Sequence, residues 1–85
     1  MGQHSHNQLI SLPNNIGNLS SLTSLSFYHN SITSLPSSIC DLTDTLEQLN
    51  MCGNNLCQDD YELCNWWAID WWNWSDGNCP QECQD

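Results

Sequence analysis

Apolar residues recur at a fixed interval along the first two-thirds of the chain. The segment NQLISLPNNIGNL at residues 7–19 aligns with NSITSLPSSICDL at residues 30–42 when the chain is shifted by 23 residues. The segment LTSLSFYHNSI, which starts at Leu22, aligns with LEQLNMCGNNL, which starts at Leu46, at a shift of 24 residues. One unit therefore reads L-x-x-L-x-[FM]-x-x-N-x-[IL]-x-x-L-P-x-x-I-x-x-L. Agreement at many positions with one period indicates an internal repeat.

Each unit opens with a segment in which apolar and polar side chains alternate. Residues 22–28 and 46–52 both show this two-residue period, which predicts a half-buried strand. An asparagine, Asn30 or Asn54, follows each strand, where a short amide can bond backbone groups that the turning chain leaves unpaired. Because one unit cannot bury its own leucines, the units are expected to stack so that the two strands lie parallel in one sheet.

This repeat resembles the leucine-rich repeat family, in its short type with LPxxIxxL, over about residues 7–56. The expected fold class is an α/β solenoid, a short leucine-rich repeat stack with parallel concave strands, followed by a helical, disulfide-stapled C-terminal cap. Three segments are expected along the chain. They are a flexible or truncated N-terminus at residues 1–6, the repeats at 7–56, and a Cys- and Trp-rich cap at 57–85.

The start of the chain lacks the leucines that a preceding unit would supply. The sequence GQHSH stands there instead, so Leu9, Ile10 and Leu12 are expected to be exposed in a monomer, beside an unpaired strand edge. A solenoid of this kind usually needs about three or more repeats to stand alone. We therefore expect either the C-terminal end of a longer solenoid or a short chain that completes its stack against another copy.

Five tryptophans fall within nine residues in the segment CNWWAIDWWNWSDGNC, at residues 64–79. Helical spacing, with acidic residues near the start, predicts an amphipathic helix whose inward stripe is Leu63, Trp67, Trp71 and Trp74. This helix is expected to cover the last repeat by resting on Leu49, Met51 and Leu56. Trp66 and Trp72 lie off the stripe, which makes them candidates for an exposed aromatic surface.

Six cysteines in a chain of 85 residues favour a disulfide framework, although six thiols allow many connectivities. Zinc binding is disfavoured because the cysteine spacings contain no C-x2-C pair. The segment is similar to the cysteine-flanked caps of extracellular leucine-rich repeat proteins, but it lacks their usual C-x-C pair, so no pairing is carried over. We expect Cys40, beside Ile39, to be a buried thiol and two disulfides to form among Cys57, Cys64, Cys79 and Cys83.

The charge of the chain restricts its partners. Ten acidic residues and no lysine or arginine give a formal net charge of −10, so nucleic acid and anionic lipid surfaces are excluded as partners. No apolar run approaches the length of a membrane span, and the first residues show no signal peptide. The expected location is extracellular or at the cell surface, with any signal outside the sequence given.

Candidate modification and catalytic sites are few. The segments NLS at Asn18 and NWS at Asn73 fit the N-glycosylation sequon. No serine has a partnered histidine, and nothing resembles a Gly-rich phosphate loop or carboxylates placed for glycoside cleavage. The chain is therefore expected not to be an enzyme and to need no cofactor or metal.

The function expected from these patterns is non-catalytic binding of another protein. The resemblance places the binding surface on the concave face, which comprises Ser24, Ser26, Tyr28, Gln48, Asn50 and Cys52. One alternative is a self-assembling structural subunit, in which the uncapped N-terminal edge docks on a further copy to form filaments or arrays. Another alternative is carbohydrate binding through the exposed tryptophans, Trp66 and Trp72.

Overall fold

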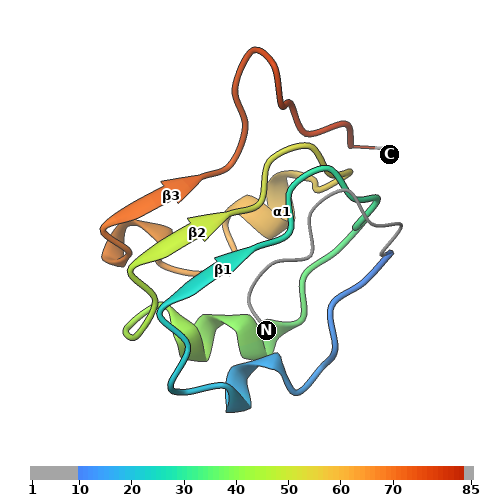
Figure 1. Cartoon of the computed structure of the whole chain (residues 1–85). Coiled ribbons are helices and arrows are strands. Elements are labelled where there is room, and N and C mark those ends of the chain that lie inside the picture. The colour runs from blue at the N-terminus through green and yellow to red at the C-terminus, as the bar shows by residue number, and fades with distance from the viewer. Residues whose placement is uncertain (1–9, 84–85) are drawn as a thin grey trace.

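The structure is a computed structural model and describes residues 10–83. Its strands form one three-stranded parallel sheet in the order β1-β2-β3, with bounds Ser24–Ser26, Gln48–Asn50 and Trp71–Asn73. Figure 1 shows the strands side by side, coloured from cyan through yellow to orange. The parallel pairing of β1 and β2 confirms the predicted arrangement, although each strand is shorter than the alternating segment that predicted it. The sheet is small and not closed, so a longer solenoid stays a prediction.

Two short 3-10 helices occupy the same place in successive repeats. They are η1, Ile16–Asn18, and η2, Ser37–Leu42, and they lie next to each other on the side away from the strands (Figure 1, blue and green). Pro36 holds extended backbone just before η2, which agrees with the restricted φ of proline. Gly17 approaches Ser38 so closely that a Cβ at this position would clash with the Ser38 carbonyl. This close contact lets the two turns stack without a gap.

The core is built from apolar side chains that successive turns direct inward. β1, β2 and the residue just after each strand contribute four of them, all 2% exposed or less: Leu25, Phe27, Leu49 and Met51. The residues after Leu-Pro in each turn, Ile16 and Ile39, are buried in the same cluster. Burial of this kind stabilises the fold by about 1.5 to 3 kcal/mol for each large aliphatic side chain. The repeat leucines are thus the main source of stability.

The asparagine after each strand bonds the backbone of its own turn, and Asn54 also bonds the preceding one. The side-chain amide of Asn54 donates to the carbonyl oxygens of Met51 at 2.9 Å and Phe27 at 3.0 Å, and its oxygen accepts from the Ile32 amide at 3.2 Å. Asn30 donates to Phe27 in the same way at 2.9 Å. Both asparagines are buried. They therefore satisfy backbone groups that water does not reach.

The C-terminal tryptophan segment forms a third turn of the repeat, so the predicted amphipathic helix is wrong. β3 pairs in parallel with β2, with Trp72 opposite Leu49, and I-x-x-W-x-W from Ile69 continues the strand pattern of the earlier units. Helix is confined to α1, Gln58–Tyr61, and to the 3-10 turn η3, Trp66–Ala68. Pairing with β3 satisfies the backbone hydrogen-bonding groups at the edge of β2. The 3-10 turn η3 buries Trp66, which the predicted helix would have exposed.

Gln81 takes the place of the asparagine that the third turn lacks. The residue one repeat after Asn54 is Gly77, which has no side chain to bond the backbone. The Gln81 amide instead donates to the carbonyl oxygens of Met51 at 2.6 Å and Trp74 at 2.7 Å, and its oxygen accepts from the Leu56 amide at 3.1 Å. The backbone groups involved correspond to those that Asn54 bonds one turn earlier.

The acidic residue Asp60 joins α1 to the preceding turn. One of its carboxylate oxygens accepts from the Cys57 amide at 3.2 Å and caps the helix, as the carboxylate of a capping box does. Its other oxygen accepts from the Leu35 amide at 3.0 Å. Asp60 is buried, and both of its oxygens are used in this way. Its role is structural.

All six cysteines form disulfides, in the pairs Cys40–Cys64, Cys52–Cys79 and Cys57–Cys83. The expectation of a free thiol at Cys40 is wrong. Of the two disulfides expected among Cys57, Cys64, Cys79 and Cys83, only Cys57–Cys83 forms, because Cys64 and Cys79 bond cysteines of the preceding turn. The physical reason is the stacking of the turns. Each bond spans 24 to 27 residues, close to one repeat, so each joins one turn to the next.

The first turn is more completely buried than its sequence indicated. Ile10 is exposed as expected, but Leu12 lies in the core, which corrects the expectation that it would face water. Leu9 and the predicted N-terminal segment at residues 1–6 lie outside the described residues. The proposed boundary at residue 57 falls between the second strand and α1, and the described turns continue across it in one core.

Replacing Asn54 by alanine is expected to lower the free energy of unfolding by about 2 to 4 kcal/mol, because it leaves buried backbone groups of two turns without a partner. Asn14→Ala, on the exposed loop before η1, provides the control and should change stability by less than about 0.5 kcal/mol. Urea denaturation of the oxidised protein measures both. Equal stability of the two variants would contradict the bridging role of Asn54.

Candidate functional site

The outward side of the sheet presents two rows of side chains. We call these residues the sheet face; they are Ser24, Gln48 and Trp71 in one row and Ser26, Asn50 and Asn73 in the other. The strand register places the members of each row on neighbouring strands. The first row is exposed and the second is half-buried. Because strand side chains alternate, the sheet face points away from the core that their neighbours fill.

The sheet face includes four of the six residues expected to bind a partner. Ser24, Ser26, Gln48 and Asn50 lie on it as the strand pattern predicted, and their role in binding stays a prediction. Tyr28 follows β1, where it is half-buried and its ring meets His29 edge-on with centroids 5.3 Å apart. Cys52 does not belong to a binding surface, because it is buried and bonded to Cys79.

Trp66, Trp67 and Trp71 face the opposite way from the prediction, whereas Trp74 is partly buried against the core, as predicted. Trp66 was assigned to an exposed surface but is 1% exposed, and its indole nitrogen donates to the Tyr61 carbonyl at 2.8 Å. Trp67 and Trp71, which were predicted to be buried, are 75% and 50% exposed. The reason is the strand geometry of β3, which turns Trp71 outward and Trp72 inward.

Trp72 is half-buried, so it is not the exposed ring that the sequence indicated. Its ring stacks near that of Trp66, with centroids 6.4 Å apart, and Tyr61 meets it on another side at 5.8 Å. Tyr61 also meets Trp74 edge-on at 5.2 Å. These rings pack against the core cluster that contains the predicted floor residues Leu49, Met51 and Leu56. The aromatic cluster therefore covers the end of the stack, although through different rings from those predicted.

Trp71 and Asn73 were missed as members of the sheet face. The sequence does contain a signal for this third strand. The segment IDWWNWSDGNC, from Ile69, aligns with LEQLNMCGNNL, from Leu46, at a shift of 23 residues. Tryptophan stands there in place of leucine and methionine. The helical spacing of Trp67, Trp71 and Trp74 in the same segment obscured this match.

Two carboxylates border the exposed row. Glu47 and Asp70 directly precede β2 and β3, and both are exposed. The Trp71 amide donates to the Glu47 carbonyl at 3.1 Å, which places the two strands in contact at this level. Among residues 10–83, no hydrogen bond or ion pair is recorded for either carboxylate group. The pair therefore gives this border of the sheet face a negative charge.

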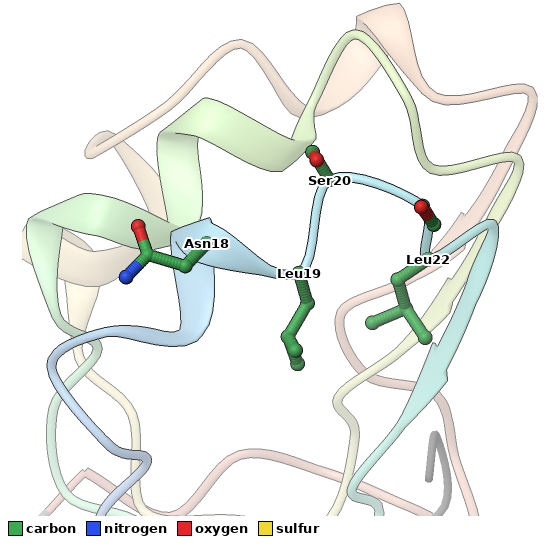
Figure 2. Close-up of a pocket in the computed structure, with 5 residues that line it drawn as sticks. Asn18, Leu19, Ser20 and Leu22 are labelled. Atoms are coloured by element: carbon green, nitrogen blue, oxygen red, sulfur yellow. The ribbon is translucent and has the colours of Figure 1, made fainter.

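A pocket of about 380 Å³ lies on the first turn and is lined by Asn18, Leu19, Ser20, Ser21 and Leu22. Figure 2 shows the side chains of Leu19 and Leu22 directed into the space enclosed by this turn. Leu19 is 36% exposed, whereas Leu42, one repeat later, is fully buried. The pocket therefore marks a corner of the stack that no further turn covers within the described part of the chain.

Both sequons lie where an enzyme can reach at least part of the asparagine. Asn18 is exposed at the end of η1 and borders the pocket. Asn73 is half-buried on the sheet face, where its amide donates to Asp76 at 3.4 Å. Glycosylation at either position stays a prediction.

Among residues 10–83, no group of three or more histidine, cysteine or carboxylate side chains is placed to hold a metal ion. No helix in this part of the chain is long and apolar enough to cross a membrane.

Comparison with known proteins supports the repeat. Residues 21–42 match the family model described as Leucine Rich Repeat, which covers the strand and 3-10 helix of one turn. No curated protein and no solved structure matches the chain. Leucine-rich repeats are typically non-enzymatic protein-interaction domains, and the three disulfides of the C-terminal region are consistent with a cysteine-flanked cap.

Trp66→Ala is expected to destabilise the protein by about 3 to 5 kcal/mol, because it removes a fully buried ring from the end of the stack. Trp71→Ala should cost less than about 1 kcal/mol, since half of this side chain is already in water. Thermal and urea unfolding of the two variants provide the comparison. If Trp71→Ala proved the more damaging change, the inward and outward assignment of the tryptophans would be wrong.

Proposed function

From the leucine-rich repeat that this chain carries, we propose that it is a non-catalytic module that binds another protein through the sheet face. The observation that supports this most directly is the exposed row Ser24, Gln48 and Trp71. Their side chains make no recorded hydrogen bond among residues 10–83, so they are not needed to hold the turns together. A large aromatic ring beside small polar groups is typical of binding surfaces.

The shape expected of a leucine-rich repeat stack favours the same surface. Parallel strands on the inner side of a curved stack form a concave surface that a partner can enter. The two rows lie across all three strands, so a partner would contact every turn at once. The sheet is rigid because neighbouring turns share a core and disulfides, which lowers the entropy lost on binding.

An extracellular location is part of this proposal. Three disulfides in a chain of 85 residues need an oxidising compartment to form and persist. A small domain also gains the most from such crosslinks, since its core alone is marginal. The module would accordingly meet its partner outside the cell or at the cell surface.

Carbohydrate binding is a second candidate, favoured by the exposure of Trp67 and Trp71. Indole rings in water can stack on sugar rings, but this surface differs from the Trp66 and Trp72 pair expected from the sequence. Titration of tryptophan fluorescence with oligosaccharides separates this candidate from protein binding.

Self-assembly is favoured by a different observation, the pocket beside Leu19 and Leu22 and the exposed Ile10. A second copy placed on this corner would cover apolar surface that the first turn leaves in water. The dependence of molecular mass on protein concentration distinguishes this candidate from a monomeric binding module.

Photo-crosslinking from the sheet face tests the proposed function. A benzophenone amino acid in place of Gln48 should capture a discrete protein from extracellular fluid, because it lies in the middle of the proposed surface. The same amino acid in place of exposed Ser37, on the helix side of the stack, is the control and should capture no such protein. Capture from position 37 and not from position 48, detected by gel shift and mass spectrometry, would contradict the proposal.

A further inference from the structure

The acidic residues of the chain all lie after its first forty residues. All ten lie at Asp41 or later, and the first forty residues contain no charged side chain other than histidine. The sheet therefore changes in character from one edge to the other. Around β1 the neighbouring positions are serine and threonine, whereas Glu47 and Asp70 flank β2 and β3.

Glu47 and Asp70 bring two negative charges to the same end of neighbouring strands. They directly precede Gln48 and Trp71, which are partners in the register of β2 and β3. The Trp71 amide donates to the Glu47 carbonyl at 3.1 Å, so the two backbones are in contact at this level. The sequence has no lysine or arginine to pair with these carboxylates. A cation from another molecule would be attracted to this border of the sheet face.

Trp71 adds an aromatic ring to this border of the sheet face. It follows Asp70 in sequence, projects on the sheet face and is half exposed. A cation over an indole face gains about 0.5 to 1 kcal/mol at an exposed site. Guanidinium suits this combination better than ammonium, because its plane stacks on a ring while its edge N–H groups bond carboxylates.

We propose that the partner of the sheet face presents an arginine side chain, which stacks on Trp71 and bonds Glu47 and Asp70. This inference rests on the proposed function and names the chemistry of the partner protein. The rest of the partner's segment lies across the neutral positions Ser24 and Gln48, whose hydroxyl and amide groups bond its backbone.

Other cationic occupants fit the surface less well. Two carboxylates from adjacent strands supply too few oxygen ligands for a calcium ion, which takes six to eight. The exposed ring also has no part in binding a hard cation. Charge complementarity therefore favours an organic cation held on a protein segment.

Calorimetry with two matched peptides tests this inference on the full oxidised chain. One peptide alternates arginine and serine, and the other carries neutral citrulline in place of each arginine. At about 0.15 M salt, where distant surface charges are screened, the arginine peptide should bind at least about tenfold more tightly. Trp71→Ala should weaken its binding by about three- to fivefold, and Trp67→Ala should leave it unchanged.

Two double variants that each remove two negative charges distinguish binding at a defined site from attraction to the net charge of the chain. Glu47→Gln with Asp70→Asn should weaken binding of the arginine peptide by about tenfold, whereas Asp44→Asn with Asp59→Asn should change it by less than about twofold. The latter two residues are exposed and lie outside the sheet face, Asp44 in the turn before β2 and Asp59 in α1. Equal weakening by both double variants would overturn the inference, because it would show attraction to net charge alone.

The experiments distinguish failure of the arginine site from failure of the proposed function. Equal binding of the citrulline and arginine peptides, with crosslinking of both from position 48, would overturn the arginine site and leave the sheet face as a binding surface. Binding that persists in every sheet-face variant would contradict both. Binding of calcium ions that Glu47→Gln with Asp70→Asn abolishes, without peptide binding, would also overturn the arginine site.

Discussion

No turn of this chain can bury its own apolar side chains, and the whole structure follows from that constraint. Leu25 and Phe27 become buried because a second turn lies against the first, and Leu49 and Met51 because a third lies against the second. The third turn places Trp72 and Trp74 at the positions of Leu49 and Met51, and both rings pack against the core cluster at this end of the stack. Disulfides between neighbouring turns hold this end of the stack in position.

The repeat itself was predictable because its period is encoded many times. Alternation at residues 22–28 and 46–52 predicted both strands and, with the repeat, their parallel pairing. Asn30 and Asn54 predicted the turns that follow the strands. The third turn was not predicted, since its tryptophans satisfy two periods at once. Positions 67, 71 and 74 have helical spacing, whereas 69, 72 and 74 fit the strand of the repeat. Local spacing could not decide between the helical and the strand period. The strand is favoured because it pairs with the open edge of β2.

The same ambiguity explains which site residues were found and which were missed. Ser24, Ser26, Gln48 and Asn50 were placed correctly on the sheet face because their strands were correct. Cys52 was misplaced because its sulfur is directed to Cys79, a partner visible only once the turns are stacked. Trp71 was assigned to the core as part of a helix, although the strand turns it outward next to Gln48. The proposed binding surface, which combines polar groups, one ring and two carboxylates, thus becomes visible only with the third turn.

Mapping of the disulfides tests the third turn most directly, because the pairing depends on how the turns stack. Proteolysis of the oxidised protein without reduction, followed by mass spectrometry, identifies the linked peptides. The stacked arrangement predicts the bonds Cys40–Cys64, Cys52–Cys79 and Cys57–Cys83, each joining residues about one repeat apart. Bonds from Cys57 to Cys64 and from Cys79 to Cys83, with Cys40 and Cys52 free, would contradict this account and favour a separate helical cap.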